Sequence, residues 1–383
     1  MKKAFILMAA AAAIGMSSCS QDETKDVAKN SNNITFRTAV GHNSRGVQLT
    51  DLNIDKMWVS AFDGTSSFFT DKKFEKQGND FVCNSNSLSW PNDEDKELQF
   101  IAYSTTATAW GTPAFTTTSA GANLTGFAAK TTIAEQEDLV IGAAKGSKKI
   151  NANGVSMTLE HILSQIKIAV KNTDDNLVYH IKGIRIANVA NQGDYALTFA
   201  AGTNQPTHAW SNLATANTLF ESEFDAQTLA ADGNLLDLTD LLKGPNTDCG
   251  AMLIPQTITS YAPGTKDDKA TGSYISLLIN VKTKGGSYIY PAAATTDNQY
   301  GWAAVAIPTI TWASGSKYIY NLDLSKGCGV VDPVNPNPGG GIVTPKPEGG
   351  KDPDKGENIF GTKIKFQVTV TPWTDSDQGF QVQ

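Results

Sequence analysis

The sequence predicts an all-β protein made of two β-sandwich domains in series. Many short segments alternate apolar and polar residues, which is the period of a strand with one buried face. Turn-forming residues separate these segments, and no alternation of strands with helices indicates an α/β fold. A length of 383 residues suits two domains, and 40% hydrophobic with 18% charged residues is typical of a folded globular chain.

The first 18 residues are predicted to be a lipoprotein signal peptide. Lys2 and Lys3 precede an apolar run over 4–16, which is too short to span a bilayer permanently. Small residues followed at once by Cys19 resemble a lipobox, so we expect Cys19 to become the lipid-modified first residue of the mature protein. The alternative is an ordinary cleaved signal with Cys19 nearby by chance. Residues 19–32 are polar and predict a flexible tether.

The first sandwich is expected over residues 33–150. Its first strand is "NITFRTAV", in which alternate residues are apolar on one face, and Arg45 follows in an exposed loop. Further strands are expected at 56–62, 80–84 and 97–104. The Thr-, Ala- and Gly-rich segment 105–130 predicts a long loop with weak strands.

The second sandwich is expected over residues 151–328. Alternating patterns predict strands over 155–170 on either side of "HILSQ", and at 179–189, 250–258, 274–283, 287–291, 303–308 and 317–324. Leucines on one broad side of "GNLLDLTDLLKG", residues 233–244, predict a short helix.

A Pro- and Gly-rich linker is predicted over 329–358, followed by a terminal strand within 359–383. In this strand four apolar residues alternate with Lys365, Gln367 and Thr369; they are Ile364, Phe366, Val368 and Val370. A linker of this length lets the strand reach either its own second sandwich or a neighbouring molecule. Both alternatives are open from the sequence.

No pattern of residues points to catalysis, a metal or a cofactor. A net charge of −7 argues against nucleic acid as a partner. The four histidines lack ligand spacing, and the carboxylates of 92–97 lack the pattern of a calcium loop. Cys83, Cys249 and Cys328 are expected to be free thiols, although a disulfide between Cys249 and Cys328 is an alternative. The seven tryptophans favour core packing over sugar stacking.

The order of several segments resembles the fimbrillin family, the lipoprotein-derived pilus subunits of Gram-negative anaerobes. These segments are "NITFRTAV", "SLSWPNDEDKELQFIAYS", "EDLVIGAAKG", "VSMTLEHILSQIKIAVKN", "MLIPQ", "IPTITWASGSKYIYNLDL" and "FQVTVTPW". The resemblance implies two tandem transthyretin-like Greek-key sandwiches, export as a lipoprotein, and cleavage after an arginine beyond the first strand. Arg45 lies in that loop, and Arg37, in the strand itself, is the second choice.

The resemblance therefore implies a non-enzymatic structural subunit of a surface fimbria, or pilus, that assembles by strand exchange and contributes to adhesion. Its expected partners are other fimbrial subunits, the outer membrane through the lipid on Cys19, and a host or bacterial surface ligand. Ile364, Phe366, Val368 and Val370 are the candidate donor-strand residues. The alternative is a surface lipoprotein that does not polymerise and binds a glycan or host ligand.

Overall fold

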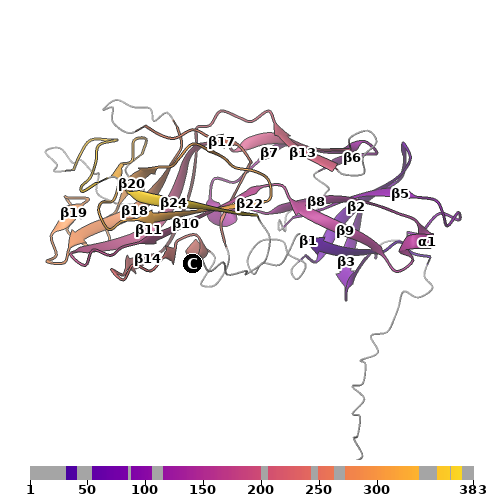
Figure 1. Ribbon diagram of the computed structural model, residues 1–383, viewed down its shortest axis with the longest axis horizontal. Coiled ribbons are helices and arrows are strands. Elements are labelled where there is room, and N and C mark those ends of the chain that lie inside the picture. The colour runs from indigo at the N-terminus through magenta and orange to yellow at the C-terminus, as the bar shows by residue number, and fades with distance from the viewer. Residues whose placement is uncertain are drawn as a thin grey trace, which may run out of the picture.

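The computed structural model of the chain describes residues 32–40, 54–84, 88–105, 115–199, 206–242, 249–262, 272–335, 352–362 and 364–372. These residues form an elongated all-β molecule, with the early strands at one end and the late strands at the other (Figure 1). Helical structure in them is limited to α1 (Lys148–Asn151) and two 3-10 turns, η1 (Ile133–Glu135) and η2 (Asp240–Leu242). None of the described helices is long and apolar enough to cross a membrane. The all-β class predicted from the sequence is confirmed.

The first body is a closed sheet of seven strands. In spatial order these are β1 (Phe36–Val40), β4 (Asp80–Val82), β3 (Ser66–Gln77), β2 (Lys56–Asp63), β5 (Leu98–Thr105), β8 (Leu139–Gly146) and β9 (Val155–His161). β1 closes the sheet by pairing in parallel with β9. The boundary expected at residue 150 therefore falls too early, because the last strand of the first sheet ends at His161.

Strands β2, β5 and β8 are covered on both faces. Met57 and Val59 of β2 point into the closed sheet, whereas Trp58 packs outside it against Phe115 and Tyr195. The outer layer is a four-stranded sheet of β13 (Pro206–Ser211), β12 (Gln192–Phe199), β7 (Gly121–Ala128) and β6 (Thr116–Thr118). Part of the segment expected as a loop with weak strands thus forms two strands of a packed layer.

The second body is a sandwich of two sheets around a large apolar core. One sheet has the order β15 (Leu236–Asp237), β10 (Ser164–Lys171), β22 (Ser316–Asp323) and β24 (Lys365–Pro372), with β16 (Ala251–Leu253) also on β10. The other has the order β14 (Thr218–Leu229), β11 (Leu177–Val189), β18 (Tyr274–Thr283), β20 (Gly301–Ala306) and β23 (Val330–Val331), with β19 (Tyr288–Tyr290) on β18. A two-stranded ladder of β17 (Thr257–Ile258) and β21 (Ile310–Thr311) lies beside them.

The helix predicted over 233–244 is wrong. Leu236 and Asp237 pair with β10 instead, and the Leu238 N–H donates to the Ile168 carbonyl at 2.8 Å. The Asp237 carboxylate accepts bonds from the Thr239 and Asp240 amides, which ends the strand in a turn. Tertiary pairing with β10 and this side-chain turn outweigh the helical spacing of the leucines.

The predicted linker over 329–358 is structured at both ends. Its start forms β23 on β20, and Asp332 is fully buried. Arg185 donates to the Asp332 carboxylate at 2.9 Å, and its guanidinium lies 4.1 Å from the centre of the Trp302 ring. Ser276 and Tyr274 donate to the same carboxylate at 2.6 and 3.1 Å. The described ends of this segment therefore belong to the second body rather than to a free spacer.

Replacing Asp332 with alanine should lower the free energy of unfolding by about 3 kcal/mol, because it leaves the buried Arg185 without its buried counter-ion. Urea denaturation measures this loss. Glu223→Ala is the matched control, since Glu223 pairs with Lys182 at 2.8 Å on the surface and should cost less than about 1 kcal/mol. Equal losses for the two variants would contradict the buried-pair argument.

A second prediction concerns pH and Asp352, which is 4% exposed and accepts a hydrogen bond from the Ala292 amide at 2.7 Å. Burial raises the pKa of Asp352 from 3.8 to about 6. The folded state therefore binds this proton more tightly than the unfolded state, so its stabilising effect is present in acid and is lost as pH rises from about 4 to 6. In Asp352→Asn that loss should be absent. Denaturation midpoints of both proteins at several pH values test this, and parallel profiles would contradict it.

Candidate functional site

The first strand, β1, is joined to the rest of the first body by few backbone contacts on one side. Residues 36–40 pair with residues 155–159 of β9, but only Phe36 pairs with β4. Upstream, the Ile34 amide donates to the Leu88 carbonyl at 2.7 Å. Loss of β1 would leave β9 with an unpaired edge and would open the closed sheet.

The side chains before and within β1 fill the centre of the first core. Ile34 and Phe36 are 2% and 0% exposed. The Phe36 ring meets the rings of Phe74 and Phe100 edge-on, with centroids 4.9 and 5.1 Å apart. Removing the strand would therefore empty apolar pockets as well as a backbone edge.

Arg37, the second choice for cleavage, points away from this core. Its side chain is 55% exposed and its Nε donates to Asp80 at 2.8 Å. The backbone at Arg37 is held in the ladder with Ser156 of β9. Arg45 and Cys19 lie outside the described residues, so their predicted roles stay predictions.

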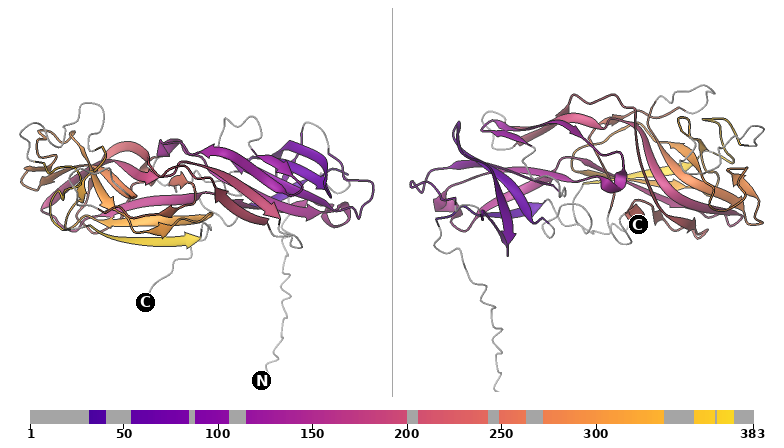
Figure 2. Two further views of the ribbon diagram at one scale, coloured as in Figure 1. Left: turned by 90° about the horizontal axis from the view of Figure 1, so that it is seen from above. Right: turned by 180° about the vertical axis from the view of Figure 1, so that it is seen from behind.

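The last strand, β24, pairs with β22 of the same chain in eight antiparallel pairs, from Ser316↔Pro372 to Asp323↔Lys365. It forms one edge of its sheet in the order given above, and Figure 2 shows it along the outside of the second body in yellow. Of the four candidate donor residues, Ile364 is buried and Val368 packs partly on the core. Phe366 and Val370 are 40% and 50% exposed. The strand is thus in place but incompletely covered.

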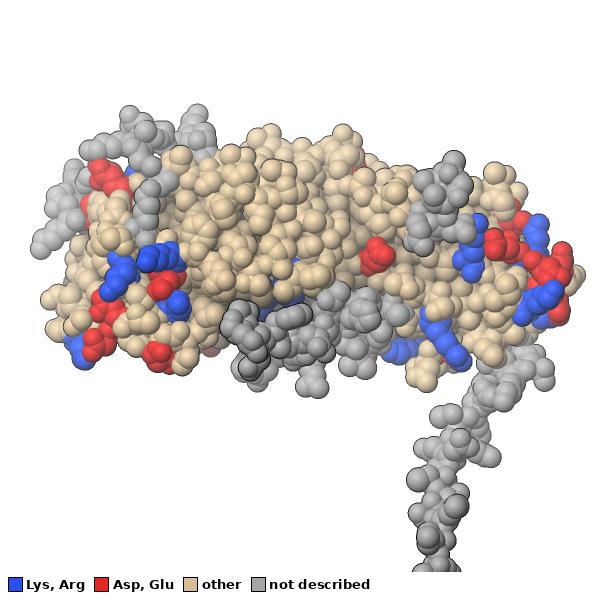
Figure 3. All heavy atoms as spheres, viewed as in Figure 1, with Lys and Arg blue, Asp and Glu red and all other residues tan. Residues whose placement is uncertain are grey.

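Charged side chains gather at the two ends of the molecule, and most of the middle of the face seen in Figure 3 is uncharged. At the α1 end, Lys148 and Lys149 pair with Glu94 and Asp95 at 2.7 and 2.6 Å. At the far end, Lys282 pairs with Asp297 at 2.7 Å. The carboxylates expected to form a solvated turn at 92–97 are therefore engaged in part by lysines. Among the described residues no cluster of three metal-binding side chains occurs.

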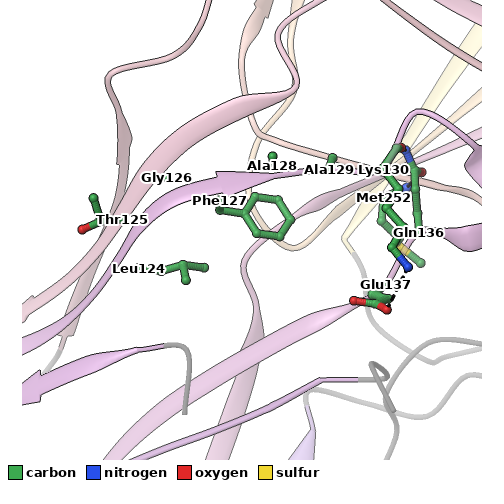
Figure 4. A pocket seen from close by; sticks show the side chains of 10 residues that line it. All are labelled: Leu124, Thr125, Gly126, Phe127, Ala128, Ala129, Lys130, Gln136, Glu137 and Met252. Atoms are coloured by element: carbon green, nitrogen blue, oxygen red, sulfur yellow. Dashed lines mark hydrogen bonds and ion pairs between the residues drawn. The ribbon is translucent and has the colours of Figure 1, made fainter. Parts of the chain in front are cut away.

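A recess of about 390 Å³ lies beside the end of β7 (Figure 4). Phe127 and Met252 line it, and the Gln136 side chain joins the Lys130 carbonyl to the Met252 amide at 2.8 and 2.7 Å. Its ionisable groups, Lys130 and Glu137, pair with each other at 3.4 Å. The lining holds no nucleophile beside a base, so this recess gives no support for an enzyme.

The histidines and tryptophans of the described residues serve packing. His161 contacts the buried carboxylate of Asp138 at 3.0 Å, and His180 contacts the Thr228 hydroxyl at 3.0 Å. Four tryptophans are buried, Trp58, Trp90, Trp302 and Trp312. The half-buried Trp210 donates its indole N–H to the Ile162 carbonyl at 2.8 Å. The described tryptophans thus present no set of stacked platforms for sugars.

Comparison with known protein families identifies the chain. The model of the fimbrillin-like family matches residues 46–373. The chain belongs to the fimbrillin-like family. No curated protein matches it.

Solved structures similar to this fimbrillin-like protein are remote in sequence. A provisionally named cell adhesion protein of Bacteroides ovatus is 12% identical, with a TM-score of 0.45, over 90% of this chain and 99% of that one. A similarly named protein of Bacteroides uniformis is 13% identical, with a TM-score of 0.40, over 89% and 98% of the two chains. The tip fimbrial protein Mfa3 of Porphyromonas gingivalis, truncated at its C-terminus, is 11% identical, with a TM-score of 0.32, over 88% and 100%.

Sequence reasoning on this fimbrillin-like chain missed the partners of its first and last strands. Nothing local marks Phe74 and Phe100 as the rings around Phe36, since they come from two other strands. Asp332 was hidden inside a Pro- and Gly-rich segment that reads as a spacer. The free thiols expected at Cys83, Cys249 and Cys328 are confirmed.

Proposed function

We propose that this fimbrillin-like protein is a non-enzymatic structural subunit of a cell-surface fimbria, assembled when β24 of one subunit takes the place of β1 in another. One observation carries the proposal: the two strands have the same apolar spacing. "ITFRTAV" begins at Ile34 and "IKFQVTV" begins at Ile364. Ile, Phe and Val recur at the first, third and seventh positions of both, and Thr38 corresponds to Val368.

The matched spacing defines a register for the exchange. Because side chains alternate between the two faces of a strand, a strand that enters along β9 in the direction of β1 would direct Ile364 to the site of Ile34. Phe366 would take the place of Phe36, between Phe74 and Phe100. Its backbone would restore the ladder to residues 155–159 of β9.

Burial favours this exchange. Phe366 and Val370 are 40% and 50% exposed in their own sheet, whereas Phe36 is 0% exposed in the site that Phe366 would enter. Complete burial of both side chains would contribute on the order of 3–4 kcal/mol from the apolar area removed from water. The exchange also leaves β22 without its neighbour, which opposes it.

Cleavage after Arg45 would separate β1 from the chain and is the proposed step that opens the groove. Export as a lipoprotein, attachment to the outer membrane through Cys19 and a surface location follow from the signal-like start of the sequence. Other fimbrial subunits are the proposed partners, with a role in adhesion to a host or bacterial surface ligand. We also propose that the two bodies are transthyretin-like Greek-key sandwiches. The fimbrial role ranks above a stationary glycan-binding lipoprotein because the described tryptophans are used in packing.

Exchange of Phe366 and Val368 for aspartate should lower filament formation more than about tenfold, because an unpaired carboxylate in an apolar groove costs several kcal/mol. Gln367→Asp with Thr369→Asp is the matched control, since these residues alternate with the apolar set along the same strand. Electron microscopy of sheared surface material measures filament number and length. Normal filaments from the Phe366 and Val368 double variant would show that β24 is not the donor.

Arg45→Ala should prevent release of β1, so the groove stays filled and filaments are lost. N-terminal sequencing of assembled wild-type protein should begin at Gly46. Arg37→Ala is the control and should be processed normally, because the Arg37 backbone is held in the ladder to β9. Wild-type filaments whose subunits still begin at Cys19 would refute cleavage at this loop.

A further inference from the structure

The described ends of the predicted linker run antiparallel to each other. The Thr362 amide donates to the Lys326 carbonyl at 2.8 Å, and the Ile359 amide donates to the Gly329 carbonyl at 3.0 Å. Val331 exchanges two further bonds, donating to the Glu357 carbonyl and accepting from the Gly356 amide, both at 2.9 Å. We call residues 326–335 and 352–362 the brace. The brace returns the chain to the second body before β24 begins.

Side chains hold both strands of the brace to the second body. The outgoing strand is held by Asp332, and Arg185 also donates to the Asn335 carbonyl at 2.8 Å. The returning strand is held where Ala292 donates to Asp352, and Ile359 and Phe360 pack on the apolar core. Each strand thus has its own attachment in addition to the bonds between the strands.

Two glycines let the brace strands approach closely where they cross. Gly361 has a φ of +69°, and a Cβ there would lie 2.0 Å from the Lys326 carbonyl oxygen. A Cβ on Gly327 would lie 2.4 Å from the Thr362 carbonyl oxygen. Because a side chain at either position would meet backbone, the contact depends on glycine at both. This crossing lies directly before the last strand.

We propose that the brace stays closed when β24 leaves its sheet, so that the donor strand pivots after Thr362. This inference rests on the proposed function for its consequence, although the brace itself does not. The last ten residues through Pro372 then set the reach, about 33 Å for an extended strand. Residues between the two brace strands add nothing to it. A partner groove must therefore lie close to the end of the brace, and the long linker does not act as a tether.

A reversible lock on the brace tests this. Val330 and Asn358 face each other as an antiparallel bridge. The hydrogen bonds flank this pair rather than join it, which is the closer type of pair, with Cα atoms about 4.5 Å apart, and suits a disulfide. The variant Val330→Cys with Asn358→Cys, with Cys83→Ser to remove the half-buried thiol, is compared in oxidised and reduced forms.

Filament assembly from trimmed protein should proceed at the same rate, within about twofold, in both forms. The reduced form is the folding control, because it has the same sequence. Assembly by the reduced form and none by the oxidised form would overturn the proposal, since the brace would then have to open for β24 to move.

Hydrogen exchange on the soluble chain separates this inference from the proposed function. The amides of Val331, Gly356, Ile359 and Thr362 should be protected, and Asp332→Ala should speed their exchange more than about tenfold. Exchange at the rate of unstructured peptide in the unaltered chain would overturn the brace. If instead the brace is protected but filaments form normally from the Phe366 and Val368 double variant, the proposed donor role fails and the brace stands.

Discussion

The closure of the first sheet by β1 is the constraint on which the first body depends. Seven strands share one apolar interior, and Phe36 occupies its centre between rings from β3 and β5. A closed sheet has no free edge, so its strands are protected from pairing with other chains. Any event that withdraws β1 changes a protected sheet into one with an edge and empty pockets. The same strand that stabilises the single chain thereby controls whether it can take up another.

The first and last strands differ in how well their own sheets cover them. Residues 34 and 36 are almost completely buried, whereas half of the apolar set of β24 is substantially exposed. An edge strand with exposed apolar side chains is a site where chains associate. Since the two strands share their apolar spacing, the less well covered strand fits the better covered site. This difference in burial gives strand exchange a direction from the second body of one subunit to the first body of another.

Buried charge and close backbone packing explain why the segment before β24 is ordered where it is described. Arg185 carries its charge into the second body, and Asp332 and Glu221 both contact it. Such a pair is costly to break on one side only, because the remaining charge stays buried. The bond from Arg185 to Asp332 therefore holds a segment whose Pro and Gly content disfavours regular structure on its own.

The sequence by itself determined the all-β class and most strands, because a period of two in apolar residues is a local property of a strand with one buried face. It also predicted the alternating face of the last strand, including Phe366 and Val370. It failed at 233–244, where helical spacing of leucines competes with pairing to β10, and at 329–358, where local composition hid a buried Asp332. The tertiary structure alone decided that β9 belongs to the first sheet, which side chains surround Phe36, and that β24 lies at an edge. Each of these depends on contacts between residues far apart in the chain, and no local pattern records such contacts.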